Sequence, residues 1–160
     1  MKVIVISDTH NRLTSLRAVI RRERDASLLI HLGDVESQES EVRQMAGIPC
    51  EMVRGNNDFF TQLPREKELI LEGHRIFLAH GHTFNIAEGM TLIADEARDR
   101  GCEAALFGHT HLPLIRETDG VTLVNPGSLS YPRQEGRIPT YILMEAEPGK
   151  PLVFTLKNAV

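Results

Sequence analysis

Short runs of hydrophobic residues, each bounded by residues that favour turns, recur along the whole chain. β-branched residues are frequent in these runs, which is typical of strands in a folded core. The predicted strands are residues 2–7, 28–32, 49–54, 67–72, 75–80, 103–108, 113–118, 120–125, 139–146 and 151–157.

Two segments between these runs space their apolar residues as one face of a helix does. The first contains Leu13, Leu16, Val19 and Ile20, and the second contains Met90, Ile93, Ala94 and Ala97. Gly101 follows the second segment at a position where glycine commonly ends a helix. We therefore expect a helix over each segment.

The two halves of the chain differ in how these elements follow one another. Strands and helices alternate in the first half, which favours parallel βαβ units, whereas neighbouring strands with short turns dominate the second half. Glu72-Gly73, Asp119-Gly120 and Pro148-Gly149 are predicted hairpin turns, because glycine can adopt the positive φ that such turns require. The predicted fold class is α/β, with two packed mixed sheets flanked by helices in a single domain over residues 1–160.

The composition agrees with one soluble globular domain, because 41% hydrophobic and 25% charged residues are ordinary values for that class. Met1-Lys2 leads directly into a hydrophobic run that is too short for a signal-peptide core, and no segment approaches the length of a membrane span. Cys50 and Cys102 lack paired-cysteine spacing, so we interpret them as buried thiols in a reducing compartment. We expect a cytoplasmic protein without a membrane partner.

Polar residues that can bind metals follow the ends of several predicted strands. Asp8 and His10 are two residues apart after the first strand, so their side chains point to the same side. Ligand sites of open α/β sheets lie at the carboxyl ends of strands, where separate segments can meet in one crevice. The candidate metal ligands are Asp8, His10, Asp34, Asn56, His80, His109 and His111.

Each motif alone also has an ordinary interpretation. Asp-x-His fits an exposed strand end, Gly-Asp and Gly-Asn-Asn-Asp fit turns, and the His-Thr-His pair fits surface or core histidines. Their joint occurrence at strand ends favours one shared site, because five of the seven histidines lie in these motifs. His31 and Asp34 are an odd number of residues apart, so their side chains are expected on opposite faces of the strand, and His31 is interpreted as a structural residue. His74 is expected in a hairpin turn.

The ligand types indicate the kind of metal. Carboxylate, amide and imidazole ligands without thiolate suit manganese, iron, zinc, cobalt or nickel, and Mn²⁺ is the first expectation. Seven ligands are more than one tetrahedral ion can bind, but they can be divided between two ions if one carboxylate bridges the ions. Asp34 is the expected bridge. Two ions about 3.5–4 Å apart can clamp a phosphoryl group and lower the pKa of bound water toward about 7.

The formal charge of −4 is compatible with an anionic substrate, because two divalent cations bring the total to zero. Basic residues are scattered except for Arg21, Arg22 and Arg24 on one predicted helix, which we interpret as a solvated face. We therefore expect a small phosphorylated substrate and no extensive nucleic-acid surface. No feature of the sequence fixes the number of subunits, so the question of a homo-oligomer stays open.

The motifs together resemble the calcineurin-like metallophosphoesterases in order and spacing across most of the chain. They are Asp8-x-His10, Gly33-Asp34, Gly55-Asn56-x-Asp58, His80-Gly81-His82 and Gly108-His109-x-His111. The short chain and the segment Asn125-Pro126-Gly127-Ser128 are similar to the small bacterial and archaeal phosphodiesterase branch. The resemblance implies a four-layer α/β/β/α sandwich.

The resemblance also implies roles for the motif residues. One ion would be held by Asp8, His10, Asp34 and His111, and the other by Asn56, His80, His109 and the shared Asp34. Beside the bridging Asp34, the expected catalytic residues are Asp58, which orients a ligand or a bound water, and His82, which contacts the phosphate. Asn11, Arg12 and Arg54, with His82, are the candidate substrate-binding residues.

One position departs from the larger members of the family. They carry a histidine after the metal-binding asparagine as a general acid, and this chain has Asn57. An amide is no useful proton donor at neutral pH, and general acid catalysis is typically worth about 10²–10⁴ in rate. Its loss favours leaving groups that need little protonation, or requires another donor such as His82.

The expected function is hydrolysis of phosphodiesters by attack of a metal-bridging hydroxide. Phosphomonoester hydrolysis at the same site is the nearest alternative, although a dianionic monoester needs more cationic help around its phosphate. A non-catalytic scaffold is the alternative of another class, because a retromer subunit resembles these enzymes but departs from the ligand pattern. This chain retains every ligand position.

Overall fold

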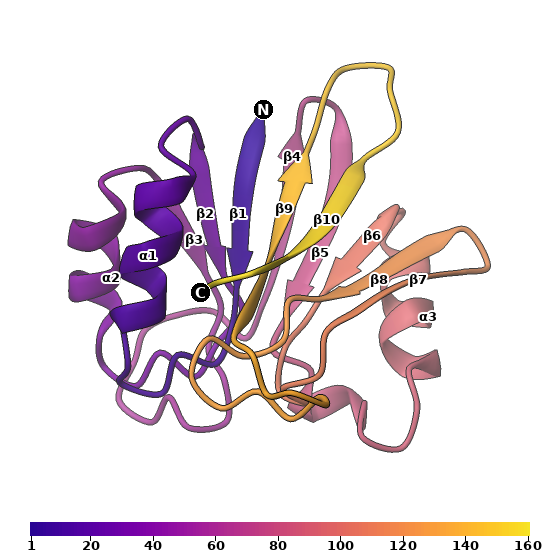
Figure 1. The fold of residues 1–160 in the computed structure, drawn as a ribbon. Helices are drawn as coiled ribbons and strands as arrows, with labels where there is room; N and C mark the ends of the chain where they lie inside the picture. Colours follow the sequence, from indigo (N-terminus) through magenta and orange to yellow (C-terminus); the bar gives the residue numbers. More distant parts are fainter.

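Two five-stranded mixed sheets lie face to face in the computed structural model, which describes residues 1–160 (Figure 1). The first sheet has the order β10-β9-β1-β2-β3 and the second β4-β5-β6-β8-β7. The strands of the first sheet are β1 (Lys2–Ile6), β2 (Leu28–His31), β3 (Cys50–Met52), β9 (Thr140–Glu145) and β10 (Val153–Asn158). Those of the second are β4 (Glu66–Leu71), β5 (His74–Ala79), β6 (Ala104–Leu106), β7 (Leu114–Thr118) and β8 (Val121–Asn125).

Helices cover the outer face of each sheet (Figure 1). The first sheet packs on α1 (Thr14–Arg22) and α2 (Glu39–Ala46), and the second packs on α3 (Thr91–Asp99). This order of layers confirms the predicted α/β/β/α sandwich. The helices are short, and none combines the length and hydrophobicity needed to cross a bilayer.

Three buried clusters fill the spaces between the layers, and β1 shows how they are built. Val3 and Val5 face the cluster between the two sheets, while Ile4 and Ile6 face the cluster under α1 and α2. Side chains of a strand alternate between the faces, so a strand buried on both sides needs a continuous apolar run. The hydrophobic runs in the sequence reflect this double burial.

All ten predicted strands and both predicted helices are confirmed. The sequence pattern did not single out α2, where only Val42 and Ala46 are buried. In the first half, β1, β2 and β3 pair in parallel, as expected. The second sheet contains the hairpins β4–β5 and β7–β8, but its centre is also parallel, because β5, β6 and β8 run in the same direction.

The predicted turns at Glu72-Gly73 and Asp119-Gly120 join adjacent antiparallel strands, and all four residues have positive φ. Pro148-Gly149 lies in a longer connection between β9 and β10. Cys50 and Cys102 are free thiols; Cys102 is buried as predicted, whereas Cys50 is only half-buried.

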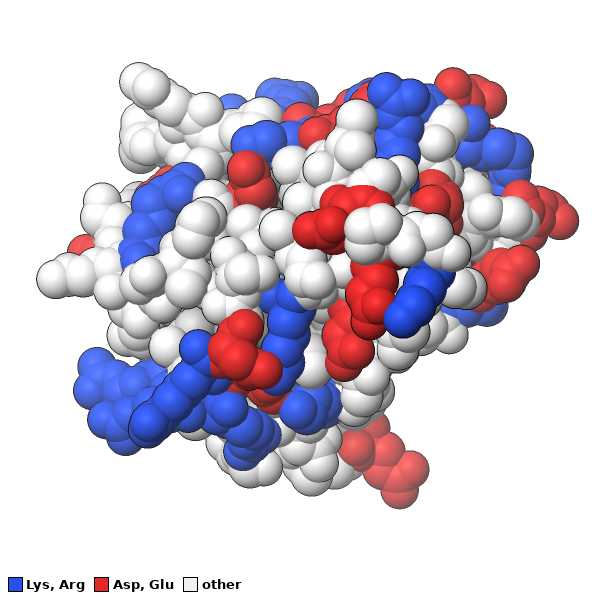
Figure 2. Space-filling model, turned by 90° about the horizontal axis from the view of Figure 1, so that it is seen from above, with Lys and Arg blue, Asp and Glu red and all other residues white.

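Charged side chains of both signs are mixed over most of the face shown in Figure 2. The exception is the corner where α1 lies, at the lower left, where Lys and Arg side chains gather. Arg21 and Arg22 form the last turn of α1, where basic side chains complement the negative end of the helix dipole. This supports the interpretation of the cluster as a solvated helix face.

Candidate metal centre

The candidate ligands are carried by loops at the carboxyl ends of parallel strands from both sheets. Asp8 and His10 follow β1, Asp34 follows β2, His80 directly follows β5, and the loop with His109 and His111 follows β6. Backbone hydrogen bonds join these loops: Asp8 N donates to Gly33 O (3.0 Å) and His10 N to Asp34 O (3.1 Å). Within the second sheet, Gly108 N donates to His80 O (2.9 Å), and between the sheets His109 N donates to Asp8 Oδ2 (3.1 Å).

Five of the seven candidates form two overlapping groups of possible metal ligands. One is Asp8, His10 and His111, and the other is Asp8, Asp34 and His80, with the ligand atoms of each group within 4.8 Å of one another. Asp8 Oδ1 lies 3.1 Å from His111 Nε2 and 3.6 Å from His10 Nε2. Asp34 Oδ2 lies 3.6 Å from His10 Nε2 and 3.4 Å from His80 Nε2.

The remaining candidates, Asn56 and His109, lie next to this cluster. Asn56 Oδ1 is 3.1 Å from His109 Nδ1, and the ring of His109 is 5.2 Å from that of His80, centroid to centroid. The structure therefore brings all seven predicted residues into one region.

The ring nitrogens of two histidines are oriented by backbone carbonyls. His80 Nδ1 donates to Leu32 O (2.7 Å) and His111 Nδ1 donates to Tyr131 O (2.7 Å). In each neutral ring the proton is thus on Nδ1, and the lone pair of Nε2 faces the centre.

Two buried acceptors in the centre have no hydrogen-bond partner: Asp8 Oδ1 and His80 Nε2. Unsatisfied buried polar atoms are costly and therefore uncommon in folded proteins. Here lone pairs face one another 3.1–3.8 Å apart, which is the arrangement that a bound cation requires. The donor set of nitrogen and oxygen atoms fits divalent transition metals.

Asn57 donates two hydrogen bonds, one to each carboxylate oxygen of Asp34. Asn57 N donates to Oδ1 (2.9 Å), and Asn57 Nδ2 donates to Oδ2 (2.9 Å). Asn57, which stands where larger family members have a histidine, therefore supports the carboxylate of Asp34. Sequence reasoning missed this role, because it considered Asn57 only as an absent acid.

Asp58 is buried behind the ligands, and its carboxylate accepts three backbone N–H groups. These belong to Asp34 (2.8 Å), Glu36 (2.7 Å) and Gly55 (2.7 Å). The carboxylate thereby fixes the two loops that carry Asp34 and Asn56. This geometry makes Asp58 a support of the loops that carry the candidate ligands.

His82 starts the short 3₁₀ helix η1 (His82–Phe84), with its ring 5.5 Å from that of His80 and 6.1 Å from that of His109. Its Nδ1 is buried without a hydrogen-bond partner. Burial lowers the pKa of His82, and the neighbouring His80 and His109 lower it further. His82 is thus mainly neutral at pH 7.

The other predicted substrate-binding residues lie at the rim. Arg12 stacks on the ring of Tyr131, 4.9 Å from its centroid, and Asn11 Nδ2 lies 3.4 Å from Glu36 Oε2. Arg54 Nη2 donates to Asp58 O (3.0 Å), so its guanidinium is already engaged by the backbone.

Five candidate ligands have a left-handed backbone: Asp8 (φ 55°), His10 (φ 43°), Asp34 (φ 58°), His109 (φ 67°) and His111 (φ 59°). Residues other than glycine rarely adopt this conformation, and such strain concentrates at functional sites. Glycine neighbours allow the crowding: a Cβ at Gly108 would lie 2.0 Å from Ser7 Oγ, and one at Gly55 would lie 2.1 Å from Asp34 Oδ1.

The carboxylates of Asp8 and Asp34 are both ionised at neutral pH. Burial alone would raise the pKa of Asp34, but contacts with His80 and Asn57 outweigh burial and bring it to about 2. The pKa of Asp8 is also lowered, because contacts with His10, His111 and His80 outweigh its burial. The centre therefore offers two negative charges to a cation.

Sequence reasoning did not identify the residues that tie the loop after β8 to the centre. Ser128 Oγ donates to Asp8 O (2.8 Å), and Asn125 Nδ2 donates to Gly108 O (2.9 Å). The segment Asn125–Ser128 was noticed only through the family resemblance, and its pattern of small and turn-forming residues does not by itself reveal these contacts.

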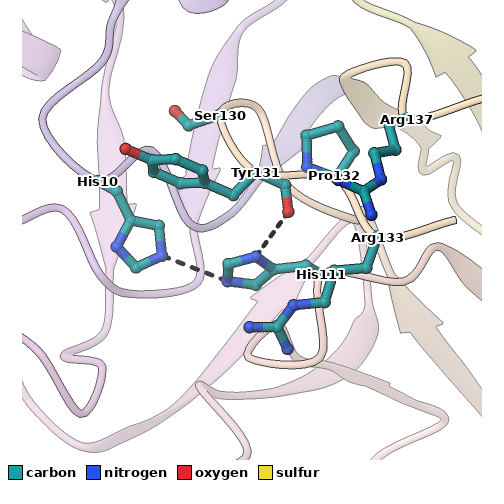
Figure 3. Close-up of a pocket in the computed structure, with 7 residues that line it drawn as sticks. All are labelled: His10, His111, Ser130, Tyr131, Pro132, Arg133 and Arg137. Carbon is teal, nitrogen blue, oxygen red and sulfur yellow. Dashed lines mark hydrogen bonds between the residues drawn. The ribbon is translucent and has the colours of Figure 1, made fainter.

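Two cavities border the centre. One, of about 760 Å³, opens beside His10 and His111 and is lined further by Ser130, Tyr131, Pro132, Arg133 and Arg137 (Figure 3). The other, of about 640 Å³, borders His109 and is more apolar, with Ile86, Met90, Leu112 and Leu114 in its walls. Substituents of a substrate can thus extend from the centre in two directions.

The two-sheet sandwich with a nitrogen–oxygen donor set at its edge is the architecture of the metallophosphoesterase class of proteins. The family model of the calcineurin-like phosphoesterase superfamily domain matches residues 1–149, and the chain belongs to this family.

Among the relatives, the probable metallophosphoesterase YsnB of Bacillus subtilis is 32% identical over 148 residues, which covers 92% of this chain and 85% of the relative. Phosphodiesterase YfcE of Escherichia coli is 27% identical over 157 residues, which covers 83% of this chain and 82% of the relative.

Two solved structures show the same fold. A predicted phosphoesterase from Streptococcus pneumoniae has a TM-score of 0.86 at 26% identity and covers 99% of this chain and 89% of its own. Vps29 of Entamoeba histolytica in complex with Zn²⁺ has a TM-score of 0.79 at 18% identity, with full coverage of both chains. The second likeness shows the fold alone.

Proposed function

We propose that this chain is a single metallophosphoesterase domain that hydrolyses phosphodiesters with the help of two divalent cations. The observation that carries the proposal is the pair of buried, unpartnered acceptors Asp8 Oδ1 and His80 Nε2 among further inward-facing ligands. A cation bound among these ligands would supply the partner that both atoms lack.

In this proposal, Asp8, His10, Asp34 and His111 hold one cation, and Asn56, His80, His109 and the shared Asp34 hold the other. Asp34 is supported as the bridge because its Oδ2 lies between His10 and His80, 3.6 Å and 3.4 Å from their Nε2 atoms. Asp8 belongs to both ligand groups and is the second carboxylate that can contact both cations.

When bound, the cations supply positive charge to the phosphate and lower the pKa of a coordinated water. Mn²⁺ is the first expectation, with iron, zinc, cobalt and nickel as alternatives that the same donors accept. Neither cysteine belongs to the ligand groups.

The protein side chains position the substrate around this centre. Asn57 and Asp58 hold Asp34 and its loop in place. His82, neutral and with an unpartnered Nδ1 beside His80 and His109, can hydrogen-bond a phosphate oxygen. Arg12 and Asn11 lie at the edge where a substrate enters the centre, beside Tyr131 and Glu36.

A diester is favoured over a monoester because cavities border the centre on two sides. One opens at His10 and His111 and the other at His109. A phosphodiester carries two substituents, and each cavity lies within the range of volumes that accommodates a small organic group. The name of the relative YfcE supports the same preference.

The proposal predicts Mn²⁺-dependent hydrolysis of bis(p-nitrophenyl) phosphate, with a smaller kcat/KM for p-nitrophenyl phosphate. Asp34→Asn and His80→Ala should each lower kcat/KM for the diester at least about a hundredfold, because each removes a central ligand. Asp25→Asn, a surface change, should have no effect.

Three outcomes would contradict the proposal. Unchanged hydrolysis in Asp34→Asn and His80→Ala would show that the site is not the catalyst. Preference for the monoester would indicate a phosphomonoesterase. Stoichiometric Mn²⁺ binding without turnover of either ester would favour the scaffold function.

A further inference from the structure

The loop of residues 128–137, from Ser128 to Arg137, is bound directly to the candidate ligands. Ser128 Oγ donates to Asp8 O (2.8 Å), and His111 Nδ1 donates to Tyr131 O (2.7 Å). Arg133 N donates to His111 O (3.1 Å). The first part of this loop, up to Arg133, is therefore held against the candidate centre.

The cavity between loop 128–137 and the centre is lined by cationic but no anionic side chains. Its lining contains Arg133 and Arg137 and no aspartate or glutamate. Figure 3 shows Arg133 beside His111 and Arg137 farther along the loop, past Pro132. Two guanidinium groups in the lining of one cavity make its electrostatic potential positive, which attracts an anion.

Both arginines are available to a ligand. Arg133 Nη1 has one long contact, to Thr110 O at 3.4 Å, which leaves most of its donors free. The planar fork of a guanidinium matches the oxygens of a phosphate.

Arg137 has an unusual backbone. Its φ of 47° follows that of Gly136 at 81°, so two consecutive residues are left-handed. Glycine adopts this conformation without steric cost, whereas arginine does not. A strained backbone at a cavity wall is a feature of ligand-binding sites, and here it presents a charged side chain to the cavity.

We propose that Arg133 and Arg137 form an anion subsite that binds a second phosphate, carried on one arm of a phosphodiester substrate. This inference rests on the proposed phosphodiesterase function and adds the substrate class. The cavity of about 760 Å³ exceeds the need of one phosphate and accommodates an organic arm together with its phosphate. The scissile phosphate binds at the metals, and the second phosphate binds at the arginines.

Two chromogenic esters with the same leaving group test this proposal: the p-nitrophenyl esters of thymidine 5′-phosphate and of thymidine 3′,5′-bisphosphate. With the Mn²⁺-loaded protein, kcat/KM should be about tenfold higher for the bisphosphate ester, mainly through KM. Arg133→Gln and Arg137→Gly should each bring this ratio toward one. Arg137→Gly also removes the backbone strain, so thermal unfolding should show a fully folded variant.

Binding of the corresponding products provides a measurement that does not need turnover. By calorimetry, the Mn²⁺-loaded protein should bind thymidine 3′,5′-bisphosphate about tenfold more tightly than thymidine 5′-phosphate, and both variants should lose this difference. Arg21→Gln, an equal loss of charge on the exposed side of α1, should retain it.

The proposal is overturned if the wild-type protein binds both products equally, if both variants keep the preference, or if Arg21→Gln loses it to the same extent. Hydrolysis of both esters without preference would reject the subsite and leave the phosphodiesterase function standing. A calorimetric preference that depends on Arg133 and Arg137, without hydrolysis of either ester, would support the subsite and reject the phosphodiesterase function.

Discussion

Asn57 shows how one residue can support a site through hydrogen bonds to a candidate ligand. Its backbone and side-chain amides each donate a hydrogen bond to one oxygen of Asp34. Oδ2 also lies 3.6 Å from His10 Nε2 and 3.4 Å from His80 Nε2, so it faces the centre. The side chain therefore orients the carboxylate that we propose as the bridge.

Replacement of Asn57 should weaken metal binding. Asn57→Ala removes the donor to Asp34 Oδ2 and should lower the affinity for Mn²⁺ about tenfold, because partners of metal ligands orient them. Calorimetric titration with Mn²⁺ measures this change. Gln62→Ala, an exposed amide farther along the same loop, is the matched control. Equal affinity of Asn57→Ala and the wild-type protein would show that the side-chain amide does not position Asp34.

Hairpin turns show how single elements depend on backbone conformation. β4 and β5 are joined by Glu72 and Gly73, both left-handed, with φ of 51° and 85°. Two-residue turns of this kind favour Asn-Gly, because asparagine tolerates positive φ better than glutamate. Glu72 is thus a suboptimal residue in a well-formed hairpin.

The change Glu72→Asn should raise the free energy of unfolding by about 0.5 kcal/mol, since it lowers the cost of the left-handed backbone. Gly73→Ala should instead lower it by about 1 kcal/mol, because alanine is strained at positive φ. Urea denaturation of both variants measures the two changes. A destabilising effect of Glu72→Asn would mean that the glutamate side chain stabilises the hairpin by another contact.

A buried carboxylate links distant parts of the whole molecule. Glu23, which follows α1 and is only 4% exposed, accepts hydrogen bonds from Tyr141 Oη (2.6 Å) and Lys157 Nζ (2.5 Å). Lys2 Nζ lies 2.9 Å from its other oxygen. These contacts connect α1 with β1, β9 and β10, so the first and last strands of the chain share one ionic cluster.

This cluster predicts a specific acid sensitivity. Burial alone would raise the pKa of Glu23, but hydrogen bonds from Lys157, Tyr141 and Lys2 outweigh burial and lower it from 4.5 to about 2. A carboxyl group with a lowered pKa in the folded state stabilises the fold above its unfolded pKa. This contribution is complete above about pH 5 and is lost as the pH falls from 4.5 toward 2.

The change Glu23→Gln should lower the free energy of unfolding by about 2 kcal/mol at pH 7, since the variant loses the hydrogen bonds to a charged carboxylate. The difference should shrink between pH 4.5 and pH 2. Urea denaturation at several pH values measures it, with the exposed Glu117→Gln as control. A difference that stays constant with pH would show that the effect of Glu23 is not electrostatic.

Local patterns in the sequence determined most elements and the chemical character of the site. Central strands such as β1, β2 and β6 are buried on both faces, so their hydrophobic runs are visible without any tertiary information. The ligand residues stand at the ends of these runs with short, recognisable spacings. α2 was not predicted, although Val42, Met45 and Ala46 have helical spacing, because three apolar residues in eight form only a short stripe. The cytoplasmic location stays a prediction.

Only the tertiary structure decided which residues meet around those ligands. His109 N contacts Asp8 across 101 residues, and Ser128 Oγ contacts it across 120. The support of Asp34 by Asn57, the anchoring of loops by Asp58 and the placement of Arg133 and Arg137 depend on how two sheets stack. No local spacing contains that information, because the distances between these residues are set by packing of the sheets and not by the chain that separates them.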